Sequence, residues 1–196
     1  VTWLMTSLQN FHLSAPEPQR STRCHAGYHW EWDGVHFEIL HPTQQSYRDP
    51  RIRDNDRSCV LKIESVNLRI LLPGDVERRS ENALLARQAE RLRADILLAP
   101  HQGSKTSSSS AFVSTVRPHA VIFPVGYRNR FHHPHREVLG RYIGHGSRVF
   151  RTDRDGALLI EADSSGPVRI TAYRSSYRRY WQTLPAPGVI SAPTKH

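Results

Sequence analysis

Alternation of hydrophobic and polar positions indicates paired strands in the first half of the chain. The stretch "HWEWDGVHFEILHP", residues 29–42, alternates on both sides of Asp33-Gly34, and Asp-Gly is a strong signal for a tight hairpin turn. Two further apolar runs, residues 59–63 and 68–72, flank a short turn. The pattern therefore predicts two consecutive β-hairpins, separated by a charged loop over residues 43–57.

The second half of the chain combines short apolar runs with helical spacing. Apolar residues separated by charges at helical spacing predict an amphipathic helix over 77–93, serines that can cap a helix precede "AFVSTV", and "PHREVLGRYIGHG" opens with Pro and closes with Gly as helices do. Strands are expected in the apolar runs at 95–100, 119–126, 147–152, 156–162 and 167–174. This order predicts an α/β layered domain with a mixed sheet.

The two ends of the chain carry weaker patterns. Residues 1–29 are polar and irregular and predict loop structure with one short helix near residues 4–8. The pattern assigns residues 1–175 to one domain and residues 176–196 to a basic tail or linker. The basic, aromatic stretch "YRSSYRRYW", residues 173–181, would suit single-strand binding, or would equally form a final strand and a solvated tail.

Composition adds a preference for anionic partners. The chain has 196 residues, 27 Lys and Arg against 18 Asp and Glu, and a formal net charge of +9. A basic surface favours nucleic acid, anionic lipid or acidic substrates, although a genome that encodes arginine often would give the same excess. No apolar run is long enough to cross a membrane, and no secretory signal opens the chain, which starts at Val1 and reads as a piece of a longer protein.

The two cysteines leave two alternatives open. Cys24 and Cys59 are too far apart in sequence for a metal knuckle of the CxxC type. They would pair in an oxidising compartment or remain as two buried thiols.

Candidate chemistry follows three of the expected strands. Asp75 comes after "LLPG", His101 after "LLAP", and a third loop, "GYRNRFHHPH", presents Asn129, Arg130 and His133. Ligand sites in open α/β sheets gather at the carboxyl ends of strands, and a carboxylate with imidazoles can hold a divalent ion while leaving a position for water. Each piece alone is also typical of a plain turn or a surface histidine.

Six sequence motifs, in their order along residues 30–160, resemble those of a known family. The motifs are "WEWDGVHFEILHP", "SCVLKI", "LLPGD", "ADILLAPHQGSKTSSS", "GYRNRFHHPHREVLGRY" and "RTDRDGALLI". Together they resemble the metallo-β-lactamase-like domain of ComEC, the DNA-uptake channel protein of natural competence. The resemblance implies an αβ/βα sandwich that here lacks its first strands, with a site for one or two divalent ions, Mn or Zn.

The same resemblance assigns roles to residues. It makes Asp75 and His101 metal ligands, and Asp75, His101 and Lys105 catalytic residues. Phosphate contacts fall to Ser104, Lys105, Asn129, Arg130 and His133. The family's "HxDxDH" cluster is absent, so further ligands are expected upstream of Val1, and Gln102 stands where the family shows a second histidine.

The activity that the resemblance implies is metal-dependent hydrolysis of DNA, directed at the strand that is not imported. A non-catalytic module that binds DNA or braces the channel is the alternative, favoured by Gln102, and a hydrolase of small esters is a third. The expected partners are single-stranded DNA, the membrane channel portion of the same polypeptide and competence DNA-receptor proteins. The expected location is the cytoplasmic (inner) membrane, with this domain on the outer face, where a Cys24–Cys59 disulfide would fit.

Overall fold

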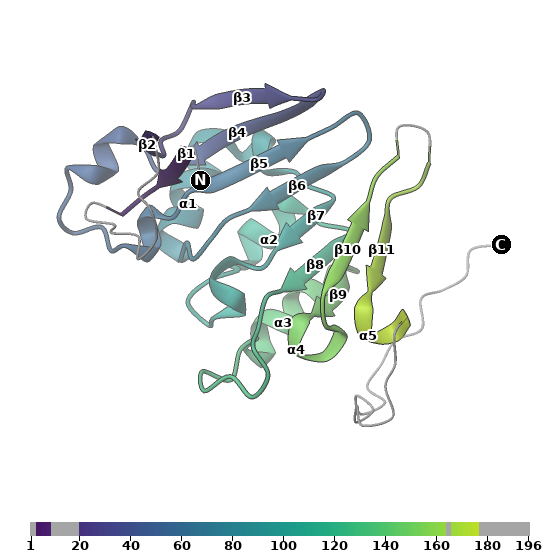
Figure 1. Cartoon of the computed structure of the whole chain (residues 1–196). Helices are drawn as coiled ribbons and strands as arrows, with labels where there is room; N and C mark the ends of the chain where they lie inside the picture. The colour runs from purple at the N-terminus through teal and green to yellow at the C-terminus, as the bar shows by residue number, and fades with distance from the viewer. Residues whose placement is uncertain (1–2, 9–19, 164–165, 177–196) are drawn as a thin grey trace.

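The computed structural model describes residues 3–8, 20–163 and 166–176. A mixed seven-stranded sheet forms its centre, with the strands in the order β3-β4-β5-β6-β7-β8-β9 (Figure 1). The pairings from β3 through β6 are antiparallel, and the pairings from β6 through β9 are parallel. The strands are β3 (His29–Trp32), β4 (Val35–His41), β5 (Val60–Glu64), β6 (Arg69–Leu72), β7 (Ile96–Leu98), β8 (Ala120–Phe123) and β9 (Arg148–Arg151).

Both predicted hairpins are present. The turn between β3 and β4 consists of Asp33 (φ 49°) and Gly34 (φ 74°), the two left-handed positions of a tight hairpin that Asp-Gly favours. Strands β5 and β6 pair from Leu61↔Leu72 to Glu64↔Arg69 across the second predicted turn. The charged loop between the hairpins contains two short 3-10 turns, η1 (Gln44–Tyr47) and η2 (Asn55–Arg57).

Three helices lie against one face of the sheet (Figure 1). They are α1 (Arg78–Gln88), which continues into the 3-10 turn η3 (Ala89–Leu92), α2 (Ser110–Val116) and α3 (Arg136–Gly144). Ser109 caps α2, because its hydroxyl accepts a hydrogen bond from Phe112 N at 3.3 Å. All three predicted helices are therefore confirmed.

Strand alternation builds the main core between the sheet and these helices. Leu40, Val60, Leu71, Leu97 and Val121 point to the helix side and are fully buried. They form one cluster with apolar side chains from the three helices, including Leu84, Phe112, Val113, Val138 and Tyr142.

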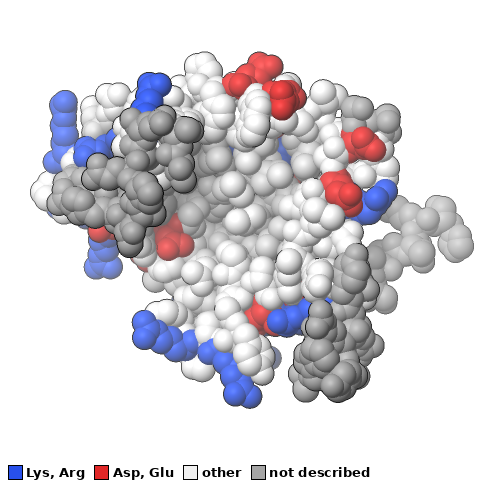
Figure 2. Space-filling view, viewed as in Figure 1, with Lys and Arg blue, Asp and Glu red and all other residues white. Residues whose placement is uncertain are grey.

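The opposite face of the sheet is covered in part. The antiparallel hairpin of β10 (Leu158–Glu161) and β11 (Arg169–Ala172) packs a second apolar cluster over Ile96 and Ile122. The short helices α4 (Thr152–Asp155) and α5 (Tyr173–Ser176) flank this hairpin. Figure 2 shows that the centre of this face carries few charged side chains. The α/β prediction with a mixed sheet is confirmed.

The amino-terminal segment corrects one prediction. Residues Trp3–Thr6 form strand β1, which pairs in parallel with β2 (Arg20–Arg23), so the short helix expected near residues 4–8 was wrong. Tertiary contacts explain the strand, since the Trp3 ring packs edge-on against Trp30 with centroids 5.6 Å apart, and its indole N–H bonds to Thr22. A Cys24–Cys59 disulfide ties this segment to the start of β5, which decides between the two alternatives for the cysteines.

Two further points concern the ends and the surface of the chain. The predicted tail, residues 176–196, lies outside the described residues except for its first position in α5. Within the described ranges, no helix combines the length and the apolar composition needed to span a bilayer.

Candidate functional site

Three loops leave the same edge of the sheet, because β6, β7 and β8 run parallel. They carry Asp75, His101 and His133, as the sequence predicted for strand-end loops. Two backbone hydrogen bonds join them: His101 N donates to Gly74 O at 3.0 Å, and His135 N donates to Gly103 O at 2.8 Å. The three loops therefore form one connected edge.

The loop after β7 has an unusual backbone. His101 (φ 47°), Gln102 (φ 52°) and Gly103 (φ 83°) occupy the left-handed region in succession. For His101 and Gln102 this conformation costs about 1 kcal/mol each, and such strain is found most often at functional sites. A Cβ at Gly103 would lie 2.6 Å from the Phe123 ring and 2.8 Å from Pro134 Cβ, so only glycine fits there.

His101 lies among other titratable side chains. Its Nδ1 is buried, makes no hydrogen bond of good geometry and lies 3.3 Å from Glu77 Oε1, within ion-pair distance. Its ring centroid is 6.0 Å from that of His133. Burial lowers the pKa of His133, and the neighbouring His101 and His135 lower it further, while the carboxylate of Asp75 opposes the shift. Sequence analysis missed Glu77, although it stands two residues after Asp75.

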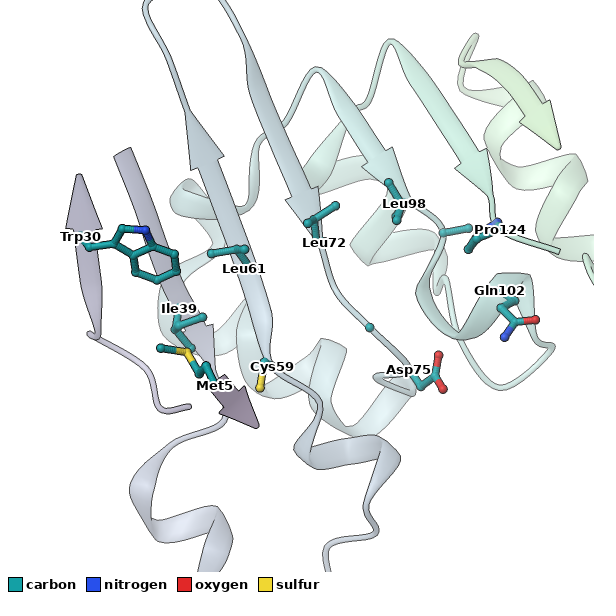
Figure 3. Close-up of a pocket in the computed structure, with 12 residues that line it drawn as sticks. Met5, Trp30, Ile39, Cys59, Leu61, Leu72, Asp75, Leu98, Gln102 and Pro124 are labelled. Carbon is teal, nitrogen blue, oxygen red and sulfur yellow. The ribbon is translucent and has the colours of Figure 1, made fainter. Parts of the chain in front are cut away.

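Asp75 lines a groove of about 480 Å³ on the partly covered face of the sheet. Figure 3 shows Asp75 and Gln102 at one end of this groove, with apolar side chains along its strands. His101 is not among the groove's lining residues, so the polar neighbour that Asp75 meets there is the amide of Gln102. The Asp75 backbone is fixed by its N–H bond to Ser58 Oγ at 3.1 Å. The apolar lining residues include Met5, Trp30, Ile39, Leu61, Leu72 and Leu98.

The structure does not bring Lys105 and Ser104 to this groove. Lys105 lines a second groove, with Arg78, Thr106 and Arg141, and its Nζ lies 3.9 Å from Glu137 in an exposed ion pair. Ser104 is nearly buried, and its hydroxyl lies 3.1 Å from that of Thr106, within the loop itself. Their predicted phosphate contacts remain predictions.

A buried carboxylate that was not predicted from the sequence holds the serine tract. Glu81 of α1 is fully buried and accepts hydrogen bonds from the backbone N–H groups of Ser108 and Ser109, the latter at 2.8 Å. Burial raises the pKa of Glu81, against the opposing effect of these hydrogen bonds. On the sequence it reads as one more charge of an amphipathic helix, whereas it fixes the loop that follows His101.

The other two predicted phosphate contacts lie in the loop between β8 and α3. Asn129 bonds to the backbone of His133 twice: its Oδ1 accepts from His133 N at 2.8 Å, and its Nδ2 donates to His133 O at 2.9 Å. Arg130 is exposed, with its Cζ 4.8 Å from the centroid of the Phe131 ring. Asn129 thus shapes the loop, whereas Arg130 presents its charge at the surface.

The described residues supply part of a metal-ligand set and do not complete one. The imidazole of His101 and the carboxylate of Asp75 are suitable donors for Mn²⁺ or Zn²⁺. However, in the described part of the chain no three His, Cys, Asp or Glu side chains converge closely enough to hold an ion.

Comparison with known proteins relates the chain to bacterial competence proteins. The chain is 35% identical over 174 residues to competence protein ComA of Neisseria gonorrhoeae, a match that covers 89% of the chain and 24% of the relative. It is 36% identical over 139 residues to recombination protein 2 of Haemophilus influenzae, covering 71% of the chain and 17% of that protein. The chain belongs to the ComEC-type family of competence proteins.

The match to the ComEC-type relatives covers only part of each relative. The chain spans about a quarter or less of the length of these relatives. No protein-family model matches it. Among solved structures, a putative metal-dependent hydrolase from Parabacteroides distasonis matches with a TM-score of 0.43 and 15% identity, covering 69% of this chain and 59% of that one. A likeness at that level supports no argument about fold or activity.

Proposed function

We propose that this chain is the metallo-β-lactamase-like portion of a ComEC-type competence protein and hydrolyses phosphodiester bonds of the DNA strand that is not imported. The observation that carries the proposal is that Asp75, His101 and His133 lie on three connected loops at one sheet edge, in a chain related to competence proteins. The net charge of +9 supports a polyanionic substrate.

In this proposal Asp75 and His101 are two ligands of a divalent cation, Mn²⁺ or Zn²⁺, whose remaining ligands lie outside the described residues. A bound divalent cation lowers the pKa of a coordinated water and neutralises charge that develops on the phosphate. Glu77, 3.3 Å from His101 Nδ1, orients the imidazole, as carboxylates commonly do for ligating histidines. His133, with its lowered pKa, presents a neutral imidazole beside that site at neutral pH.

We also propose partners and a cellular location for the chain. The membrane channel portion of the same protein and competence DNA-receptor proteins are its proposed partners, and the cytoplasmic membrane is its location. The Cys24–Cys59 disulfide favours the outer face, because disulfides persist in oxidising compartments and are rare in the cytosol.

A second candidate function has a specific observation in its favour. Gln102 is the polar side chain that shares the groove with Asp75, and an amide is a poor metal ligand. Without a complete ligand set the same surface would bind DNA or brace the channel without cleavage.

Cleavage of DNA tests the proposal. The protein as its gene encodes it, including any residues before Val1, is incubated with labelled single-stranded DNA and Mn²⁺ or Zn²⁺. Asp75→Ala and His101→Ala are each expected to lower the cleavage rate at least about 100-fold, because each removes a metal ligand. The control, Glu161→Gln, changes a half-exposed carboxylate on β10 and should cleave as the unmodified protein does. A folded, metal-loaded protein that does not cleave would favour the non-catalytic function.

A further inference from the structure

Two large aromatic rings lie exposed in the loop between β8 and α3, residues 124–135, here called the aromatic loop. Tyr127 is 69% exposed and Phe131 is 63% exposed, whereas the aromatic side chains Phe112, Phe123 and Tyr142 are fully buried. The loop projects from the carboxyl edge of the sheet (Figure 1). These two rings therefore add little to packing, and their surface is available to a partner.

An arginine stacks on each ring. Arg128 Cζ lies 5.3 Å from the centroid of Tyr127, and Arg130 Cζ lies 4.8 Å from that of Phe131. A guanidinium stacked on a ring keeps its in-plane N–H donors free to bind phosphate oxygens. Figure 2 shows basic side chains projecting at the lower edge of the molecule, where Figure 1 places this loop.

Several other arginines of the chain are held in ion pairs. Arg69, Arg151 and Arg154 each bind an aspartate at 2.6 to 2.8 Å. Neither Arg128 nor Arg130 has a carboxylate or carbonyl partner among the residues that the structure describes. The charges of Arg128 and Arg130 therefore remain available to an anionic partner beside the exposed rings of Tyr127 and Phe131.

The aromatic loop is held in a defined shape and is connected to the candidate site. The two hydrogen bonds between Asn129 and the His133 backbone close its tip. The Phe131 ring stacks on His133, with centroids 5.8 Å apart and planes 20° apart, and His133 in turn contacts His101. A row of planar groups thus runs from Arg130 to the sheet edge.

We propose that the aromatic loop is a stacking surface for single-stranded nucleic acid, with unpaired bases on Tyr127 and Phe131 and backbone phosphates on Arg128 and Arg130. Two ring–guanidinium pairs in succession match the alternation of base and phosphate along a strand, and a duplex would keep its base faces hidden. The inference rests on the proposed function, because it names the surface that delivers the strand to Asp75 and His101.

Binding without cleavage tests this inference. Fluorescence anisotropy of a labelled deoxythymidine oligonucleotide of about 15 residues is measured with the full chain in EDTA, at several salt concentrations. Tyr127→Ala and Phe131→Ala should each weaken binding at least about fivefold, and Phe131→Trp should preserve it. Arg130→Gln should lower the slope of log affinity against log salt by about 1.

Controls separate the surface from general effects. Leu159→Ala removes a side chain that is 58% exposed on β10, away from the loop, and should bind as the unmodified chain does. Unchanged affinity in both alanine variants would overturn the inference. Phe131-dependent binding to vesicles of phosphatidylserine and phosphatidylcholine, without binding to the oligonucleotide, would also overturn it and assign the loop to a membrane surface.

The two proposals fail separately in these experiments. If no metal supports cleavage but oligonucleotide binding depends on Phe131, the nuclease proposal fails and the stacking surface stands. If cleavage depends on Asp75 but Phe131→Ala binds and cleaves as the unmodified protein does, the stacking surface fails and the nuclease proposal stands.

Discussion

The loop after β7, residues 99–109, is anchored by buried serine side chains, whereas the aromatic loop after β8 projects from the molecule. In the first, here called the serine loop, Ser104, Ser107 and Ser108 are buried, and Ser107 Oγ donates to Pro100 O at 2.8 Å. In the second, the rings of Tyr127 and Phe131 are exposed, and Asn129 closes the tip with two hydrogen bonds to the His133 backbone. The two loops nevertheless leave neighbouring parallel strands.

This difference shows how one sheet edge can carry both a loop that holds a site residue in place and a loop that exposes side chains to a partner. The serine loop is fixed from outside by Glu81 and by the close approach of Phe123, so it holds His101 in place. The aromatic loop is fixed at its tip by Asn129 and at its start by the bond from Thr152 Oγ1 to Val125 O, and it leaves its rings and charges to the solvent. The bond from His135 N to Gly103 O joins the rigid loop to the base of the exposed one.

The largest effect should come from adding one methyl group to the serine loop. Gly103→Ala should lower the free energy of unfolding by about 3 kcal/mol or more, because its Cβ would meet the buried Phe123 ring at 2.6 Å in a left-handed backbone. The matched control in the aromatic loop is Gly126→Ala, whose Cβ would have nothing within 4 Å and should change stability by less than about 0.5 kcal/mol. Urea unfolding measures both, and equal losses would contradict the contrast between the loops.

A smaller effect should follow from removing the side chain that closes each loop. Glu81→Ala leaves the N–H groups of Ser108 and Ser109 without their acceptor in a buried place and should cost about 3 kcal/mol of unfolding free energy. Asn129→Ala removes two partly solvent-accessible hydrogen bonds to His133 and should cost about 1 kcal/mol. If Asn129→Ala lost more unfolding free energy than Glu81→Ala in the same experiment, the expected difference between the two loops would be contradicted.

The smallest of these effects depends on pH. Burial raises the pKa of Glu81 above its ordinary value of 4.5, so the folded chain retains this proton to higher pH than the unfolded chain. The stability that the protonated carboxyl contributes is fully present below the unfolded pKa and is lost as pH rises through the folded pKa. Between about pH 5 and about pH 8, the unmodified chain should therefore lose stability relative to Glu81→Gln. A constant difference between the two across this range would rule the effect out.

Local patterns in the sequence were enough to predict most of the sheet. The Asp33-Gly34 turn, the apolar run of residues 68–72 and the helix over residues 77–93 each carry a signal within a dozen residues or so. The strand-end positions of Asp75 and His101 followed from these elements, because parallel strands end at one edge.

The parts of the fold and of the candidate site that were not predicted depend on contacts between residues distant in sequence, which no local pattern encodes. Trp3 lies in a strand because it meets Trp30 and pairs with β2, next to residues 4–8, for which the sequence indicated a helix. Lys105 is next to Ser104 in the loop after His101, yet it faces a different groove from Asp75. The role of Glu81 appears only when α1 packs beside the serine loop, 27 residues further along the chain.

The order of strands in the sheet has a consequence for how the chain folds. Each strand from β3 to β9 hydrogen-bonds to its immediate neighbour in sequence, so every pairing closes a chain segment no longer than one turn, loop or helical crossover. Loop closure is then cheap in entropy at each step, and folding rates rise when contacts are local. The sheet can therefore grow strand by strand from its amino-terminal hairpin as the polypeptide leaves the ribosome.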